Sequence, residues 1–195
     1  MESQTDTKTN LLVFVVGTSG SGKDSVMRET VSFLTSQSIP ATTLKRAITR
    51  PPDRNEDSTF MTVDEFLKHK EDNEFALSWH VYDNWYGCSW VGINKAIREN
   101  QLLLINISRS ILFKAREVFP DCLIVLVTVP KEIAASRILK RGREDEKGLQ
   151  TRLTRMESKI EIPTPNIIVE NTGNLNKTAE ELGNFLKHHY LTIRG

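Results

Sequence analysis

The sequence predicts an α/β fold in which a parallel sheet of five strands carries helices on both faces. Strand-length apolar runs alternate with helical patterns along most of the chain, an order typical of parallel sheets. The runs are dense in valine, isoleucine and leucine, as expected for strands covered on both faces. The expected strands are 11–16, 42–48, 102–107, 122–129 and 166–170, and the expected helices are 24–37, 90–100, 109–119, 131–141, 148–159 and 176–189.

The first strand and the first helix enclose a glycine-rich loop. Residues 17–24 read Gly-Thr-Ser-Gly-Ser-Gly-Lys-Asp and match the spacing G-x-x-x-x-G-K of a phosphate-binding loop, which needs a strand before it and a helix after it. Backbone N–H groups of such a loop and the positive end of the helix bind phosphates, and Lys23 would reach the β- and γ-phosphates. We therefore expect a nucleoside triphosphate to bind at Gly17, Thr18, Ser19, Gly20, Ser21, Gly22, Lys23, Asp24 and Ser25.

One position of the loop departs from the motif. The motif has a Ser or Thr for Mg²⁺ after its lysine, whereas this chain has Asp24. A carboxylate is also a suitable oxygen ligand for the metal. Either Asp24 or the hydroxyl of Ser25 could serve it, and the sequence does not choose between them.

The segment 49–89 interrupts the alternation of strands and helices. It opens with Pro51 and Pro52, continues with polar and charged residues, and is rich in aromatic residues later. We interpret it as an inserted substrate-binding subdomain within one kinase domain of residues 11–195. The run 141–147 is so highly charged that we expect a mobile lid or a solvated loop there, with the lid spanning residues 137–152.

Composition narrows the class of protein. A net charge of +1 over 195 residues gives no case for nucleic acid as a partner. The longest apolar runs are too short to span a membrane, and the polar residues 1–10, expected to be flexible, lack the apolar core of a signal peptide. Cys88 and Cys122 form no metal or redox spacing, so we expect reduced thiols in a cytoplasmic protein.

Several segments, in order, resemble the guanylate kinase superfamily across residues 11–171. The family's arginine loop for the substrate phosphate is similar to Thr49-Arg50-Pro51-Pro52, and its phosphate-binding tyrosine segment is similar to Asn84-Trp85-Tyr86-Gly87. Its arginine-bearing lid is similar to residues 137–144, followed by Arg152. The resemblance implies a phosphate-binding-loop kinase with a substrate-binding insertion and a lid.

Within the superfamily, the closer resemblance is to the bacterial ribose 1,5-bisphosphate phosphokinases of phosphonate utilisation. It rests on residues 22–25 (Gly-Lys-Asp-Ser), 46–50 (Arg-Ala-Ile-Thr-Arg), 76–80 (Ala-Leu-Ser-Trp-His), 106–109 (Asn-Ile-Ser-Arg) and 141–144 (Arg-Gly-Arg-Glu). It implies that ATP and ribose 1,5-bisphosphate give 5-phospho-α-D-ribose 1-diphosphate (PRPP) and ADP. The implied cofactors are ATP and Mg²⁺, and the implied partner is a small sugar phosphate.

Particular residues favour this acceptor over GMP. Guanylate kinases read guanine with a Glu before the Trp and a Ser or Thr after Tyr-Gly, and Ser78 and Cys88 stand at those places. Arg46 stands where guanylate kinases carry a Ser. Ribose 1,5-bisphosphate has no base but has a second phosphate, which carries roughly −1.5 to −2 charge, so an added guanidinium fits it.

The resemblance also assigns roles to residues. Lys23, Arg137, Arg141 and Arg152 would be catalytic cations that neutralise the transferring phosphoryl group. Asn171 would contact the nucleotide, and the acceptor would be bound by Arg46, Arg50, Ser78, His80, Tyr86 and Arg109. Solvated helix faces remain an alternative for the arginines, and ordinary packing remains one for Tyr86 and His80.

Two other functions stay open at this stage. One is a nucleoside monophosphate kinase, and the other is a non-catalytic interaction module, which would tolerate loss of the lysine and the lid arginines that this chain retains. Guanylate kinases place Asp-x-Asp after the third strand, whereas this chain has Asn106-Ile107-Ser108. We hypothesise that the carboxylate facing the metal has moved to Asp24. The sequence does not distinguish a monomer from a homodimer.

Overall fold

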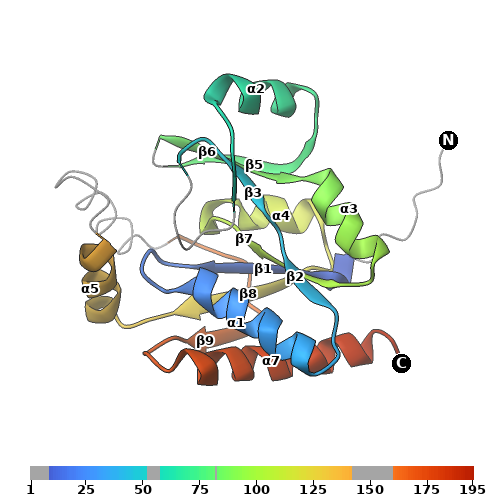
Figure 1. Cartoon of the computed structure of the whole chain (residues 1–195), viewed down its shortest axis with the longest axis vertical. Coiled ribbons are helices and arrows are strands. Elements are labelled where there is room, and N and C mark those ends of the chain that lie inside the picture. The colour runs from blue at the N-terminus through green and yellow to red at the C-terminus, as the bar shows by residue number, and fades with distance from the viewer. Residues whose placement is uncertain (1–8, 52–57, 82, 142–159) are drawn as a thin grey trace.

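The main sheet of the protein has five parallel strands, with the polar loops that follow them gathered at one edge. The computed structural model describes residues 9–51, 58–81, 83–141 and 160–195. The strand order is β2-β7-β1-β8-β9 (Figure 1). The bounds are β1 (Leu12–Gly17), β2 (Ala41–Thr43), β7 (Leu102–Asn106), β8 (Leu123–Thr128) and β9 (Ile167–Glu170). Every pair of neighbours in this sheet is parallel, which confirms the expected fold class.

Helices cover both faces of the main sheet. On one face, α1 (Lys23–Ser36) and α7 (Leu175–Thr192) pack against Val13 and Val15 of β1. On the other face, α3 (Trp90–Arg98) and α4 (Leu112–Val118) share a core with Phe14. Successive residues of β1 therefore enter different cores, and burial on both faces explains why the strand is a continuous apolar run.

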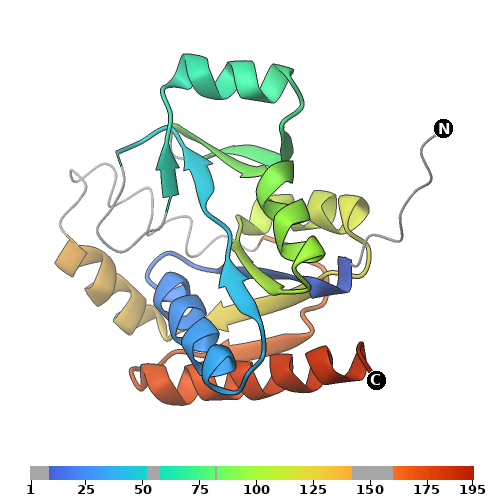
Figure 2. The ribbon, with the colours of Figure 1, turned by 45° about the vertical axis from the view of Figure 1, so that its right-hand side comes forward.

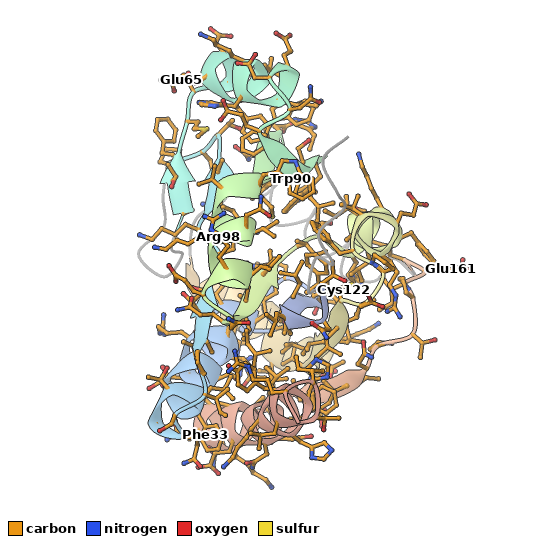
Figure 3. All side chains as sticks on the ribbon, turned by 90° about the vertical axis from the view of Figure 1, so that its right-hand side faces the viewer. Phe33, Glu65, Trp90, Arg98, Cys122 and Glu161 are labelled. Atoms are coloured by element: carbon orange, nitrogen blue, oxygen red, sulfur yellow. The ribbon has the colours of Figure 1, made fainter. Side chains whose placement is uncertain are left out.

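A second, smaller sheet lies over the face that carries α3 and α4. Its order is β4-β3-β6-β5, with the bounds β3 (Arg46–Ile48), β4 (Ser58–Phe60), β5 (Phe75–Val81) and β6 (Asn84–Ser89). Figure 2 shows α2 (Val63–Glu71) beyond this sheet, on the side away from the main sheet. The sticks in Figure 3 show how side chains fill the space between these layers, from α2 to α7.

The expected strand 42–48 is wrong as a single element, because it divides between the two sheets. Residues 41–43 pair with β7 in the main sheet, and residues 46–48 pair with β4 and β6 in the small one. Both halves are at least partly buried, so hydrophobicity alone does not reveal the break. The division carries the chain from the main sheet to the small sheet.

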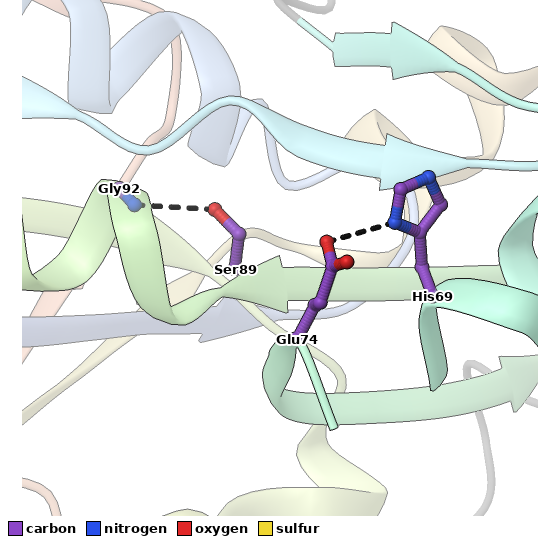
Figure 4. A network of polar contacts seen from close by, with 4 residues as sticks. All are labelled: His69, Glu74, Ser89 and Gly92. Carbon is purple, nitrogen blue, oxygen red and sulfur yellow. Dashed lines mark hydrogen bonds and ion pairs between the residues drawn. The ribbon is translucent and has the colours of Figure 1, made fainter. Parts of the chain in front are cut away.

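Polar contacts fix how the small sheet joins its helices (Figure 4). His69 Nδ1, near the end of α2, lies 2.8 Å from Glu74 Oε2, just before β5. Ser89 ends β6, and its side chain accepts a hydrogen bond from the backbone N–H of Gly92 at 3.2 Å. Ser89 is thus the N-cap of α3, so the strand passes directly into the helix.

The remaining expectations concern shorter or undescribed segments. The expected helix 109–119 begins as the 3-10 turn η2 (Arg109–Ile111), with α4 following it, and α5 (Lys131–Arg141) has its expected bounds. The expected helix 148–159 and most of the expected lid lie outside the described residues. At the N-terminus, η1 (Thr9–Leu11) is described, and the Thr9 hydroxyl donates to Asp121 at 3.1 Å. Among the described helices, none has both the length and the apolar character needed to cross a membrane.

Candidate active site

The phosphate-binding loop connects β1 to α1 at the carboxyl edge of the main sheet. Gly20 (φ 81°) and Gly22 (φ 76°) have left-handed backbone conformations, which glycine adopts without a steric penalty. Gly22 is the N-cap of α1, and no side chain caps that helix. The first backbone N–H groups of α1 therefore face the position where an anion binds at a helix N-terminus, and Lys23 is the first residue of the helix.

Two side chains from distant elements hold the carbonyl groups of this loop. Arg137 of α5 donates from Nη1 to the Gly20 carbonyl at 3.3 Å and from Nη2 to the Asn171 carbonyl at 3.2 Å. Asn171, directly after β9, donates from Nδ2 to the Ser21 carbonyl at 2.8 Å. Ser21 and Asn171 are both buried, so water does not compete strongly for these bonds. The loop is therefore braced by α5 and β9 as well as by its own turn.

The catalytic arginines expected from the sequence are described only in part. Arg137 contacts the loop itself, as above. Arg141 belongs to α5, but its side chain lies outside the described residues, as does the whole of Arg152. The structure thus places one of these three arginines, and it places that one against the phosphate-binding loop.

Asp24 meets the end of a neighbouring strand. Asn106, the last residue of β7, donates from Nδ2 to Asp24 Oδ1 at 2.6 Å. Asp24 lies in the first turn of α1, and Ser25 follows it there. Asn106 is only 6% exposed, so the Asp24–Asn106 pair is sheltered from solvent on the strand side.

The donor set at this edge fits a magnesium ion that arrives with a nucleotide. Among the described residues, no group of three or more His, Cys, Asp or Glu side chains could hold a metal ion. Magnesium in phosphotransferases is usually held by one or two carboxylates together with substrate phosphates. Asp24 provides such a carboxylate beside the loop, so a protein-only metal site is not required.

A buried cation lies on the inner face of the small sheet. Arg46 of β3 is 6% exposed, and its Cζ lies 5.6 Å from the ring centroid of Tyr86 on β6. Tyr86 stacks on Trp79 of β5, with centroids 5.4 Å apart. Burial raises the pKa of the nearby Cys88 thiol to about 12, and Arg46 lowers it only in part. Cys88 is therefore neutral, and Arg46 supplies positive charge to this aromatic wall.

The other expected acceptor residues lie in different places. Arg50 follows β3 by two residues and donates from Nη1 to the Pro51 carbonyl at 3.3 Å. Arg109 opens η2, three residues after the end of β7, at the edge of the main sheet that carries Asn106. Both are half-buried. Arg50 follows β3, the strand that carries Arg46, and Arg109 follows β7, the strand that ends at Asn106.

Ser78 and His80 do not join Arg46 and Tyr86. Leu77 and Trp79 belong to the core between the two sheets, and successive side chains of a strand point to opposite faces. Ser78 and His80 therefore point to the α2 side, where the ring of His80 lies 4.9 Å from that of Trp85. The resemblance located these residues along the chain, but it did not reveal the face on which they lie.

Asn106 and Trp79 were not among the expected site residues. Asn106 had a recognisable signal, because polar residues at the carboxyl end of a buried parallel strand lie at the ligand-binding edge of the sheet. Trp79 had none, because an aromatic residue in an apolar strand is usually core. Only the pairing of β5 with β6, which sets Trp79 opposite Tyr86, shows that Trp79 packs against the ring beside Arg46.

Comparisons with known proteins identify related sequences. The sequence model of the family described as guanylate kinase matches residues 8–189. Ribose 1,5-bisphosphate phosphokinase PhnN of Acidiphilium cryptum is 37% identical over 150 residues, which cover 77% of this chain and 79% of that protein. The protein of the same name from Pseudomonas paraeruginosa is 32% identical over 176 residues, covering 89% and 94% of the two chains.

A solved structure supports the fold. The crystal structure of guanylate kinase from Anaplasma phagocytophilum is similar with a TM-score of 0.62 and 17% sequence identity, covering 92% of this chain and 85% of that one. The family model spans nearly the whole described chain, from before β1 to within α7. The chain therefore belongs to the guanylate kinase family.

Proposed function

We propose that this protein transfers the γ-phosphoryl group of ATP to a phosphate of ribose 1,5-bisphosphate, forming PRPP and ADP. Membership of the guanylate kinase family makes the chain an ATP-dependent phosphotransferase. The sugar phosphate acceptor is supported by the relatives named ribose 1,5-bisphosphate phosphokinase, which are similar over most of the chain. It is also supported by the chemistry of the wall that Arg46, Tyr86 and Trp79 form on the inner face of the small sheet.

The buried guanidinium of Arg46 is the observation that carries the acceptor. A guanidinium only donates hydrogen bonds, so its natural partners are acceptors such as phosphate oxygens. The amino and imino groups of guanine are donors and require an acceptor, which Arg46 does not offer. Ser78 and Cys88, at the base-reading places, carry no charge, and Ser78 points to the other face of the sheet. The wall therefore suits a second phosphate better than a guanine base.

The reaction needs positioning and positive charge rather than a general base. The attacking atom is an ionised phosphate oxygen, which bonds to the γ-phosphorus while the bond to the ADP oxygen breaks and ADP leaves with the electron pair. Lys23 and the N–H groups at the start of α1 stabilise the β- and γ-phosphates. Arg46, Tyr86 and Arg50 hold the acceptor. Mg²⁺, when bound beside Asp24, supplies further neutralisation of phosphate charge.

Other features of the enzyme are part of the same proposal. We infer that residues 49–89 form the substrate-binding insertion and that residues 137–152, with Arg141 and Arg152, form the lid. Cys88 and Cys122 are free thiols and both are buried, as in proteins of a reducing compartment. We therefore place the reaction in the cytoplasm.

The acceptor is tested with the purified protein and MgATP. We expect ADP release with ribose 1,5-bisphosphate, and a phosphorus NMR spectrum of the product that matches PRPP. GMP should be a poor acceptor. Efficient phosphorylation of GMP, with no product from ribose 1,5-bisphosphate, would reject the proposed acceptor and leave a nucleotide kinase.

The role of Arg46 is tested with a matched pair of variants. Arg46→Ser should raise the KM for ribose 1,5-bisphosphate about 10- to 150-fold, because a hydrogen bond to a charged group contributes ~1.5–3 kcal/mol. The KM for ATP should stay close to that of the wild type. Arg28→Ser is the control, because Arg28 is exposed on α1 and pairs only weakly with Glu29, at 3.6 Å. An equal effect of both variants would contradict the assigned role.

A further inference from the structure

We propose that Asn106 is a positioning residue that holds the Asp24 carboxylate for the magnesium ion of MgATP. In phosphate-binding-loop enzymes the ion is held by a hydroxyl in the loop and by an aspartate on a neighbouring strand. Here the loop position is Asp24 and the strand-end position is Asn106, and the two are in contact. Compared with the usual arrangement, the carboxylate is in the loop, at Asp24, and the neutral group is at the end of the strand, at Asn106. This inference rests on the proposed use of ATP, but not on the identity of the acceptor.

The geometry of the pair supports this assignment. The contact joins residues 82 positions apart in the chain, at 2.6 Å between Asn106 Nδ2 and Asp24 Oδ1. Asn106 is held at the end of β7, where its neighbour in β1 is Val15, two residues before the loop begins. Because Asn106 is buried, the orientation of its amide is set by the sheet rather than by solvent. A fixed donor on one oxygen therefore limits how the Asp24 carboxylate can rotate.

The charge of the pair explains why the strand residue is an amide. A second carboxylate at this distance would repel that of Asp24, because like charges so close interact unfavourably. The amide N–H of Asn106 instead donates a hydrogen bond to the Asp24 carboxylate. One carboxylate at the site, together with the nucleotide phosphates, is a donor set that magnesium accepts. Groups that orient a metal ligand commonly affect metal affinity themselves.

If the carboxylate has changed position in this way, a carboxylate placed at residue 106 should replace that of Asp24 in metal binding. We would compare the wild type with Asn106→Ala, with Asp24→Ser and with the double variant Asp24→Ser/Asn106→Asp, which has the usual arrangement. The probe is Mn²⁺, a spectroscopically visible substitute for Mg²⁺, and its affinity is measured by electron paramagnetic resonance in the complex with a non-hydrolysable ATP analogue. No acceptor is present, so the result does not depend on the identity of the acceptor.

We expect Asn106→Ala to weaken Mn²⁺ binding about 10- to 100-fold, as is typical when an orienting partner of a metal ligand is removed. Asp24→Ser should weaken it at least as much, and the double variant should recover most of the loss. Thr128→Val is the control, because Thr128 ends the neighbouring strand β8 and its hydroxyl donates to the Val169 carbonyl at 3.4 Å. Its Mn²⁺ affinity should equal that of the wild type.

Binding of the ATP analogue without metal separates this role from a structural one. Asp24→Ser should bind the metal-free analogue at least as tightly as the wild type does, because a negative charge near the phosphates has been removed. Asn106→Ala should bind it with unchanged affinity. The proposal is overturned if Asn106→Ala keeps wild-type Mn²⁺ affinity, if the double variant is no better than Asp24→Ser, or if metal-free binding collapses in Asn106→Ala.

Discussion

Replacing Asn171 by alanine tests whether the phosphate-binding loop is shaped from outside. Asn171 Nδ2 donates to the Ser21 carbonyl at 2.8 Å, and the Nη1 of Arg137 approaches the same oxygen only to 3.5 Å. Ser21 is fully buried, so water does not replace the lost donor. Leaving a buried carbonyl without a good partner costs about 1–3 kcal/mol. We expect Asn171→Ala to lose about 1–3 kcal/mol in total, divided between the free energy of unfolding and the free energy of ATP binding.

The direction of the effect on ATP follows from the planarity of the peptide. In a trans peptide the carbonyl of Ser21 and the N–H of Gly22 point to opposite sides, so holding the carbonyl against Asn171 turns that N–H away from it. Asn171 packs tightly against Gly22: a Cβ added at Gly22 would lie only 2.5 Å from Asn171 Nδ2. A loosened peptide must be reordered when phosphates bind. If the whole cost falls on binding, the affinity decreases about 5- to 150-fold.

The assay measures the affinities of two ligands, ATP and tripolyphosphate, for two variants, Asn171→Ala and Asn166→Ala. Calorimetry with ATP and with inorganic tripolyphosphate should show equal losses for Asn171→Ala, because the effect acts through the loop and not through the base. Asn166→Ala is the control: Asn166 lies just before the other end of β9, and its Oδ1 accepts from the Ile124 N–H at the same 2.8 Å. It should leave both affinities unchanged. Unchanged stability and affinity in Asn171→Ala would refute the bracing argument, and a loss confined to ATP would indicate contact with the base.

Three further outcomes are expected. Lys23→Ala should lower kcat about 10²- to 10³-fold with an unchanged urea midpoint, and retention of more than about a tenth of the activity would contradict its role. The backbone N–H and the hydroxyl of Thr62 both donate to Glu65 and lower its pKa below the ordinary 4.5, and Thr62→Ala removes only the bond from the hydroxyl. A depressed pKa stabilises the fold above that value, so the difference in melting temperature should be full at neutral pH and become smaller as the pH falls below 4.5, whereas a pH-independent difference would contradict it. Cys88 and Cys122, whose pKa values burial raises to about 12 and about 11, should resist Ellman's reagent at neutral pH until the protein is unfolded, and rapid reaction of either thiol in the native protein would show that it is accessible.

The main sheet could be predicted because its strands are apolar on both faces. β1, β7 and β8 are buried almost throughout, so each appears in the sequence as an uninterrupted apolar run with a helix after it. The loop after β1 could be predicted for a different reason, because glycine, lysine and their spacing carry the chemistry of phosphate binding. Both signals are local, and a local pattern is all that a single sequence shows directly.

What could not be predicted depends on contacts between distant segments. The break between β2 and β3 follows from which strands each half pairs with, and these include β7 and β6, whose paired residues lie 38 to 61 positions further along the chain. The face occupied by Ser78 is set by the pairing of β5 with β6, including an irregularity between Phe75 and Leu77 that shifts the register. A shift of one residue exchanges the two faces of a strand, so a motif match does not by itself place a side chain in a site.

Contacts between distant segments also form this site before any ligand binds. The loop carbonyls are held by Arg137 and Asn171, and Asp24 is held by Asn106. These three residues come from α5, the end of β9 and the end of β7, so they reach the loop only once the sheet has assembled. The order of the loop is therefore obtained during folding, and ATP does not have to supply it from its binding energy. A loop ordered in advance also presents its N–H groups without reorganisation during phosphoryl transfer, which is how fixed dipoles stabilise a transition state most effectively.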